Sequence, residues 1–247
     1  MDRLKRSDRS IECVRKTKSA SRARLAALAA AVLMVSRIAT VPCSGQDKSG
    51  VGTPDHIPIM TWPGPDATLL SPAVFRLIAE AGFSVNMSPL GGREANLKAL
   101  GLARAADLRL MVQDDRVSKL VEDASLPLDT LAGVVADYKS HPAFYGYFIT
   151  DEPNAAKFER LGAIVARLKE LDPAHPAYIN LFPTYANEQQ LGTPTYEEHV
   201  GRFLDTVRPP FLSFDHYPVM TSGLRPDYYR NLEIVRRMAA ERGLDLW

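Results

Sequence analysis

Two adjacent carboxylates follow directly on an apolar run near the middle of the sequence. In the stretch "FYGYFITDEPN", residues 144–154, Asp151 and Glu152 lie between aromatic and β-branched residues and Pro153. Two like charges side by side at the end of a buried strand are unfavourable, because burial disfavours the charged form of each carboxyl group. Proteins tolerate this cost where the carboxyl groups do chemistry. The residue types therefore indicate acid–base chemistry at this position.

A unit made of a short apolar strand, a polar loop and an amphipathic helix repeats from residue 57 onward. Two predicted helices begin at Ser71-Pro72 and at Thr195. The others cover 94–106 (interrupted at Gly101), 128–138, 155–171 and 227–242. The alternation of strands and helices favours a parallel sheet with helical cover. The predicted strands are 57–62, 83–87, 108–112, 144–150, 177–182 and 211–214, and the final "LDLW" is typical of the start of a seventh.

The positions of polar residues distinguish a doubly wound sheet from a barrel. No glycine-rich phosphate loop follows the first strand, and polar residues gather after several different strands, as they do at the carboxyl end of a barrel. The sequence therefore predicts an α/β fold, a (β/α)₈ barrel that is incomplete at about six and a half βα units. Its last quarter is expected beyond Trp247. The strand-end residues are Trp62, Asn86, Asp114, Glu152, Asn180 and Asp215.

The stretch "YGYFITDEP" resembles the fourth-strand motif of the large clan of retaining glycoside hydrolases built on (β/α)₈ barrels. The resemblance extends loosely over residues 57–247, where "INLFP" and "SFDHYP" look like the fifth and sixth strand ends of secreted members. It implies that Glu152 is the general acid/base, which protonates the leaving oxygen and then deprotonates the attacking water. Asp151 would help to raise the pKa of Glu152.

Two features depart from the clan's pattern. Asp151 stands where the clan usually has an Asn that binds the sugar 2-hydroxyl; it is interpreted as a second catalytic carboxylate or as a wall residue paired with a cation. The clan's nucleophile, a Glu at the end of the seventh strand, is expected beyond Trp247, and Asp215 is the substitute within the chain. The predicted substrate-binding residues, with aromatic rings that could pack on sugar faces, are Trp62, Asn86, Asp114, Asn180, Tyr185, Asp215, His216 and Tyr217, with Phe182 as a further aromatic candidate.

Two other functions remain open. One is a carbohydrate-binding barrel without catalysis. The other is a metal-dependent, sugar isomerase-like barrel that gathers His56, Glu152, Asp215 and His216 around a divalent ion. Against it, His56 precedes the first strand, and no H-x-H or H-E-x-x-H spacing occurs. We expect no metal and no cofactor.

The N-terminus has the order of a secretory signal peptide. A basic stretch precedes the apolar run 25–35 and the small and polar residues "SRIATVPCSGQ". Residues 1–45 carry ten Lys/Arg and three Asp/Glu, a net charge of +7, which leaves about −6 for 46–247 because the total is +1. We therefore expect a cleaved leader and a secreted or periplasmic domain at 46–247, without a stable membrane anchor or a nucleic-acid partner. The sequence leaves the oligomeric state open.

Overall fold

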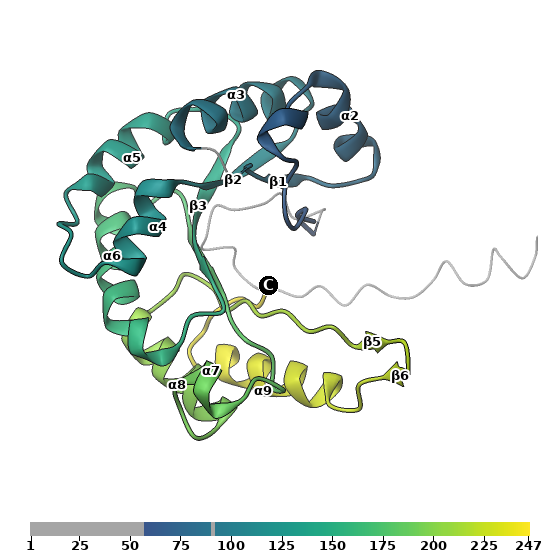
Figure 1. Ribbon diagram of the computed structural model, residues 1–247, viewed down its shortest axis with the longest axis vertical. Helices are drawn as coiled ribbons and strands as arrows, with labels where there is room; N and C mark the ends of the chain where they lie inside the picture. The colour runs from purple at the N-terminus through teal and green to yellow at the C-terminus, as the bar shows by residue number, and fades with distance from the viewer. Residues whose placement is uncertain (1–56, 90–91) are drawn as a thin grey trace, which may run out of the picture. The chain divides into compact units, whose positions relative to one another are not determined.

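Figure 1 shows the computed structural model, which describes residues 57–89 and 92–247. The predicted leader, residues 1–45, lies outside the described residues, and so does His56. Among the described residues, no helix is long and apolar enough to cross a membrane.

A four-stranded parallel sheet forms the centre of the fold. Its strands are β1 (Val85–Met87), β2 (Arg109–Gln113), β3 (Phe144–Asp151) and β4 (Ala177–Asn180), and they neighbour one another in that order. All three pairings are parallel, with Val85 opposite Arg109, Leu110 opposite Phe144 and Asp151 opposite Asn180. The carboxyl ends of these strands therefore meet at one edge of the sheet.

Single parallel bridges extend the sheet on both sides. Met60 pairs with Val85, Leu181 with Phe214, and Leu212 with Leu246. The first, sixth and seventh predicted strands thus occupy the predicted places, but only as short bridges. Seven segments follow one another around the sheet in chain order, whereas a doubly wound sheet reverses its order at a switch point. This sequential order matches the predicted barrel.

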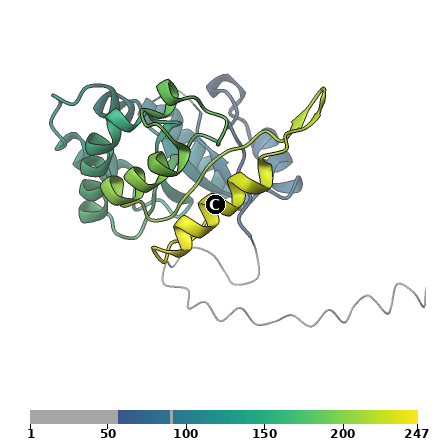
Figure 2. The ribbon, with the colours of Figure 1, turned by 90° about the horizontal axis from the view of Figure 1, so that it is seen from below.

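Helices cover the outer side of the sheet (Figure 1). The structure confirms most predicted helices but runs α3 without interruption through Gly101. It adds α4 and the short α7, which the sequence analysis did not predict, and a small β5–β6 hairpin (Val219–Met220 and Gly223–Leu224) that extends away from the helices (Figure 2). The helices are α2 (Pro72–Glu80), α3 (Gly92–Ala105), α4 (Asp115–Glu122), α5 (Thr130–Tyr138), α6 (Phe158–Leu171), α7 (Glu188–Leu191), α8 (Tyr196–Val207) and α9 (Tyr228–Ala240), with short 3-10 turns η1 (Ala67–Leu69) and η2 (Ala155–Lys157).

The sheet has one apolar core on each of its two faces, because successive side chains of a strand point to opposite faces. The larger core lies between sheet and helices; Tyr147 and Ile149 of β3 belong to it, with Phe158 of α6. The smaller core lies on the other face of the sheet and is rich in aromatic rings, including Tyr145 and Phe148 of β3. The fold thus leaves the residues that follow the strands to form the candidate site at the carboxyl edge.

Candidate active site

Glu152 lies at the carboxyl edge of the sheet, one residue beyond β3. Its backbone N–H donates a hydrogen bond to the carbonyl of Asn180, the last residue of β4, at 2.9 Å. Its φ of +43° falls in the left-handed region, which favours glycine. The half-buried side chain lies near Asp215, which follows the bridge at Phe214, and the two carboxyl groups interact.

The surroundings of Glu152 favour its protonated form. Burial, the charges of Asp215 and Asp151, and the hydrogen bond to Asp215 together raise the pKa of Glu152 to about 7. Two carboxyl groups that share one site cannot both ionise easily, so one of them keeps its proton. The other partner, Asp215, has a buried oxygen, Oδ1, that receives no hydrogen bond from a donor among the described residues. Glu152 can therefore donate a proton near neutral pH.

Asp151 points toward Asn180. The Asn180 side-chain amide donates to Asp151 Oδ1 at 3.0 Å. Loss of surrounding water raises the pKa of Asp151, and the charge of Asp215 raises it further. The hydrogen bond from Asn180 acts in the opposite direction and lowers this pKa. No cation forms an ion pair with Asp151 in residues 57–89 and 92–247. The partner of Asp151 is therefore the Asn180 amide and not a cation, which was one of the predicted alternatives.

Asn180 connects three neighbouring strand ends. Its backbone carbonyl accepts from Glu152, its amide nitrogen donates to Asp151, and its Oδ1 accepts from the Ser213 hydroxyl at 3.1 Å. The Ser213 hydroxyl lies 3.2 Å from the hydroxyl of Tyr178. The sequence analysis missed Ser213, although a single hydroxyl in the apolar run "FLSF" was a usable signal. Asn180 is 3% exposed, so it supports Asp151 and Glu152 from the interior of the fold and is not itself open to solvent.

Asn86 and Trp62 lie where the first two strand segments meet. Asn86 is fully buried, and its Oδ1 accepts from the Thr61 hydroxyl at 2.6 Å. Its Nδ2 has no hydrogen-bond partner among the described residues. The ring of Trp62 packs edge-on against Phe148 and Tyr178, with centroids 5.3 and 5.9 Å away, and is 41% exposed. Trp62 therefore extends the inner aromatic core toward solvent.

Several donors hold Asp114 at the end of β2, and its contact with a sugar remains a prediction. Its carboxylate caps α4 through the Arg116 N–H at 2.9 Å and pairs with both Nε and Nη2 of the Arg116 guanidinium. The hydroxyl of Tyr138, buried on α5, donates to its Oδ2 at 2.5 Å. Four donors thus occupy this carboxylate, which is 2% exposed. Phe182 packs in the larger core, between the sheet and the helices.

Tyr185, His216 and Tyr217 lie together where the loop after β4 meets the segment after Phe214. The Tyr217 N–H donates to the Tyr185 hydroxyl at 3.3 Å, and the guanidinium of Arg225 lies 4.0 Å above the Tyr185 ring. His216 packs edge-on against Tyr185 at 5.1 Å and lies 3.6 Å from Asp227. The charge of Asp215 raises the pKa of the exposed Tyr217. The hydroxyl of Tyr217 is therefore close enough to Asp215 to feel the charge of that carboxylate.

The alternative metal site gains no support from the described part of the chain. Within residues 57–89 and 92–247, no three His, Cys, Asp or Glu side chains are grouped as a metal site requires. His216, one of the proposed ligands, packs against the rings of Tyr185 and Tyr228.

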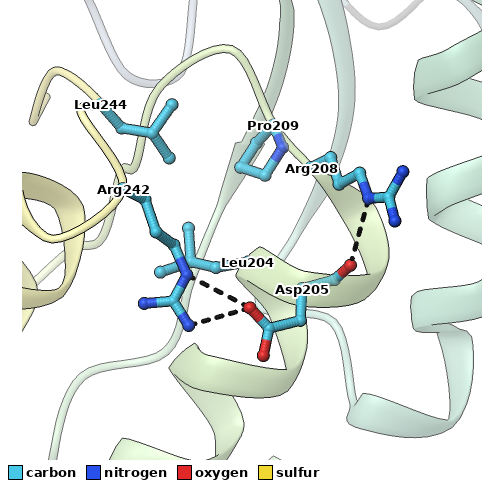
Figure 3. Close-up of a pocket in the computed structure, with 6 residues that line it drawn as sticks. All are labelled: Leu204, Asp205, Arg208, Pro209, Arg242 and Leu244. Carbon is cyan, nitrogen blue, oxygen red and sulfur yellow. Dashed lines mark hydrogen bonds and ion pairs between the residues drawn. The ribbon is translucent and has the colours of Figure 1, made fainter.

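A shallow surface pocket of about 440 Å³ lies at the other edge of the sheet (Figure 3). Its walls come from the end of α8 and the segment after α9, both of which lead into the amino ends of the next strand segments. Asp205 pairs there with Arg242 at 2.8 Å, and its carbonyl accepts from Arg208. The pocket is separate from Asp151, Glu152 and Asp215, none of which lines it. Its lining residues are Leu204, Asp205, Arg208, Pro209, Arg242 and Leu244.

Comparison with known proteins identifies the fold. No protein family and no curated protein matches the chain. A solved structure of a putative alpha-L-fucosidase from Bacteroides thetaiotaomicron VPI-5482 is similar, with a TM-score of 0.52 and 13% identity, over 78% of this chain and 69% of that one. An FMN-binding beta-glucuronidase from Facaelibacterium prausnitzii L2-6 has a TM-score of 0.51 and 12% identity, over 80% of this chain.

The chain has the fold of an incomplete (β/α)₈ barrel. The matched region spans 31% of the glucuronidase. At these identities the likeness extends to the fold alone. The activity of the chain must therefore be argued from the residues at the carboxyl edge, where active sites of this fold lie.

Proposed function

We propose that the protein is a glycoside hydrolase that cleaves O-glycosidic bonds of a carbohydrate, with Glu152 as the general acid/base. One observation carries the proposal: Glu152 lies against Asp215 at the carboxyl edge of the barrel, and its pKa is raised to about 7. A carboxylic acid that keeps its proton at neutral pH can protonate a leaving glycosidic oxygen. The similar solved structures, named as a fucosidase and a glucuronidase, agree with this reaction class.

Asp215 acts in this proposal through the proton of Glu152, not as the nucleophile. The charge of Asp215 favours the protonated form of Glu152, which a general acid needs. From the resemblance to the glycoside hydrolase clan, we propose that the nucleophile is a carboxylate that follows the seventh strand.

The remaining residues of the edge fit the binding of a sugar ring. The exposed part of Trp62 offers a ring face, and the free amide Nδ2 of Asn86 offers a buried donor. Tyr185, His216 and Tyr217 would line the other side of the site, next to Asp215. Asp151, bonded to Asn180, keeps a second carboxylate near Glu152 and so supports the raised pKa.

Hydrolysis of unactivated oligosaccharides by the full-length protein tests this proposal. Release of reducing sugar is measured across a panel of oligosaccharides for the wild type, Glu152→Gln and Glu159→Gln. We expect turnover of at least one sugar, loss of turnover in Glu152→Gln, and little change in Glu159→Gln, an exposed glutamate in the first turn of α6. Binding of a sugar without turnover would favour the non-catalytic carbohydrate-binding barrel instead.

We also propose that residues 1–45 direct export and are removed. The basic, apolar and small segments in that order support this proposal. N-terminal sequencing of the exported protein should find a start near residue 46. An exported protein that keeps Met1 would contradict it.

A further inference from the structure

The loop after β3 holds Glu152 in an unfavourable backbone conformation. A φ of +43° is uncommon for a residue with a side chain, and the following Pro153 restricts its neighbour further. Such a conformation is unfavourable and persists only where the surroundings hold it. The hydrogen bond from Glu152 N–H to Asn180 holds the side that faces β4. Another contact must hold the side that leads away from β3.

Asn154 supplies that contact, because its side chain bonds in two directions. Its Oδ1 accepts from the N–H of Ala156 at 2.9 Å and so caps η2. Its Nδ2 donates to the carbonyls of Gln189 at 2.9 Å and Gln190 at 3.0 Å, both in α7. A single amide thus joins the loop that carries Glu152 to a helix 35 residues later in the chain.

Helix α7 is a fixed support for this loop. The last four carbonyls of a helix have no partner inside it, and α7 has four residues in all. The Gly192 N–H bonds to Glu188, and Nδ1 of His199 donates to Leu191, both at 2.8 Å. Asn154 takes the two carbonyls that remain. The Leu191 side chain is buried in the larger core, which anchors α7 to the rest of the fold.

Gly192 permits the close approach of Asn154 to α7. Its φ of +71° ends the helix in the left-handed conformation, for which glycine is preferred. A Cβ at this position would lie 2.4 Å from Oδ1 of Asn154. A larger residue would therefore push the amide away from the two carbonyls.

We propose that Asn154 is a positioning residue for Glu152: by joining the loop after β3 to α7, it keeps the Glu152 side chain beside Asp215. The inference rests on the proposed role of Glu152, because it concerns how that carboxyl group is held. Asn154 itself touches neither carboxylate in this account and acts only through the backbone of residues 152–154.

Titration of the Glu152 carboxyl carbon by ¹³C NMR tests this role without any substrate. We compare the wild type with Asn154→Ala, with Asn154→Ser, whose hydroxyl can still cap Ala156 but cannot bridge both carbonyls, and with the control Asn187→Ala. Asn187 caps the other end of α7. The Glu152 resonance is assigned by its absence in Glu152→Gln.

Both Asn154 variants should lower the pKa of Glu152 from about 7 toward its ordinary value of about 4.3, because the side chain leaves its half-buried position beside Asp215. Asn187→Ala should leave the titration unchanged, although it also weakens α7. A wild-type titration in either Asn154 variant would overturn the proposal. A shifted titration in a protein that hydrolyses no glycoside would instead support the positioning role and contradict the proposed function.

A pair of glycine variants separates close contact from backbone strain. Gly192 and Gly243 both have a positive φ, +71° and +64°, but a Cβ at Gly243 meets no atom within 4 Å. Gly192→Ala should shift the Glu152 titration as Asn154→Ala does, and Gly243→Ala should not. Equal behaviour of the two glycine variants would contradict the proposed contact between Asn154 and α7.

Discussion

Glu152→Gln in the full-length protein is expected to lower turnover of substrates with poor leaving groups by about 10²–10⁴-fold. Glutamine has no proton to give to a departing alkoxide, whereas burial and the charges of Asp215 and Asp151 raise the pKa of Glu152 to about 7 and favour its protonated form. A 2,4-dinitrophenyl glycoside hardly needs protonation, so cleavage of its glycosidic bond should be much less affected. The ratio of the two rate losses is the measurement.

The same variant should respond to added azide. After the first step, Glu152 is also the base that activates water, so hydrolysis of the glycosyl-enzyme should slow. Azide needs no base and should restore turnover of the activated substrate with formation of a glycosyl azide. Equal losses on both kinds of substrate, with no azide rescue, would remove Glu152 from the acid/base role.

Asp114→Ala is expected to lower the free energy of unfolding by about 3 kcal/mol. The change removes the cap of α4 and leaves the buried Tyr138 hydroxyl and one side of Arg116 without their acceptor. Only the bond of Arg116 to Asp137 and a long contact of Tyr138 with Asn96 remain. Urea unfolding of the variant and the wild type measures the difference.

Asp66→Ala is the matched control for this prediction. Asp66 also caps a helical turn, η1, but it is solvent-exposed, and its carboxylate accepts hydrogen bonds from the N–H and the hydroxyl of Thr68. We expect a clearly smaller loss of stability there, and an unchanged titration of Glu152 in Asp114→Ala. A loss below about 1 kcal/mol in Asp114→Ala would contradict its structural role. A loss of sugar binding without loss of stability would restore the substrate-binding interpretation.

The sequence predicted the order of the sheet well because each strand has a strong local signal. Apolar runs of four to seven residues alternate with amphipathic stripes, and this alternation requires parallel strands with outer helices. The lengths of the outer segments were not predictable, because pairing of residues such as Met60 and Leu246 depends on neighbouring strands far along the chain. Helix α4 was not predicted, because Asp114, which caps it, was interpreted as a strand-end residue.

The candidate site was predictable in its residue types but not in the direction of each side chain. Asp114 and Glu152 both follow a strand, yet Arg116 and Tyr138 hold Asp114, whereas Glu152 meets Asp215. The contact of Tyr138 on α5 with Asp114 distinguishes the two cases, and a local sequence pattern does not contain it. The contact of Asn154 with α7 was hidden for the same reason, since its partners lie 35 and 36 residues away.

The central claim is that the Glu152 carboxyl keeps its proton near neutral pH because it is half-buried and lies beside the charges of Asp215 and Asp151. The most direct measurement is the ¹³C titration of Glu152 in the wild type and in Asp215→Asn, with the exposed Asp205→Asn as control. We expect a pKa of about 7 in the wild type and in the control. Asp215→Asn should lower it, though not to the ordinary value, because burial and Asp151 still favour the protonated form. A wild-type pKa near 4.3, the ordinary value for Glu, would contradict the account.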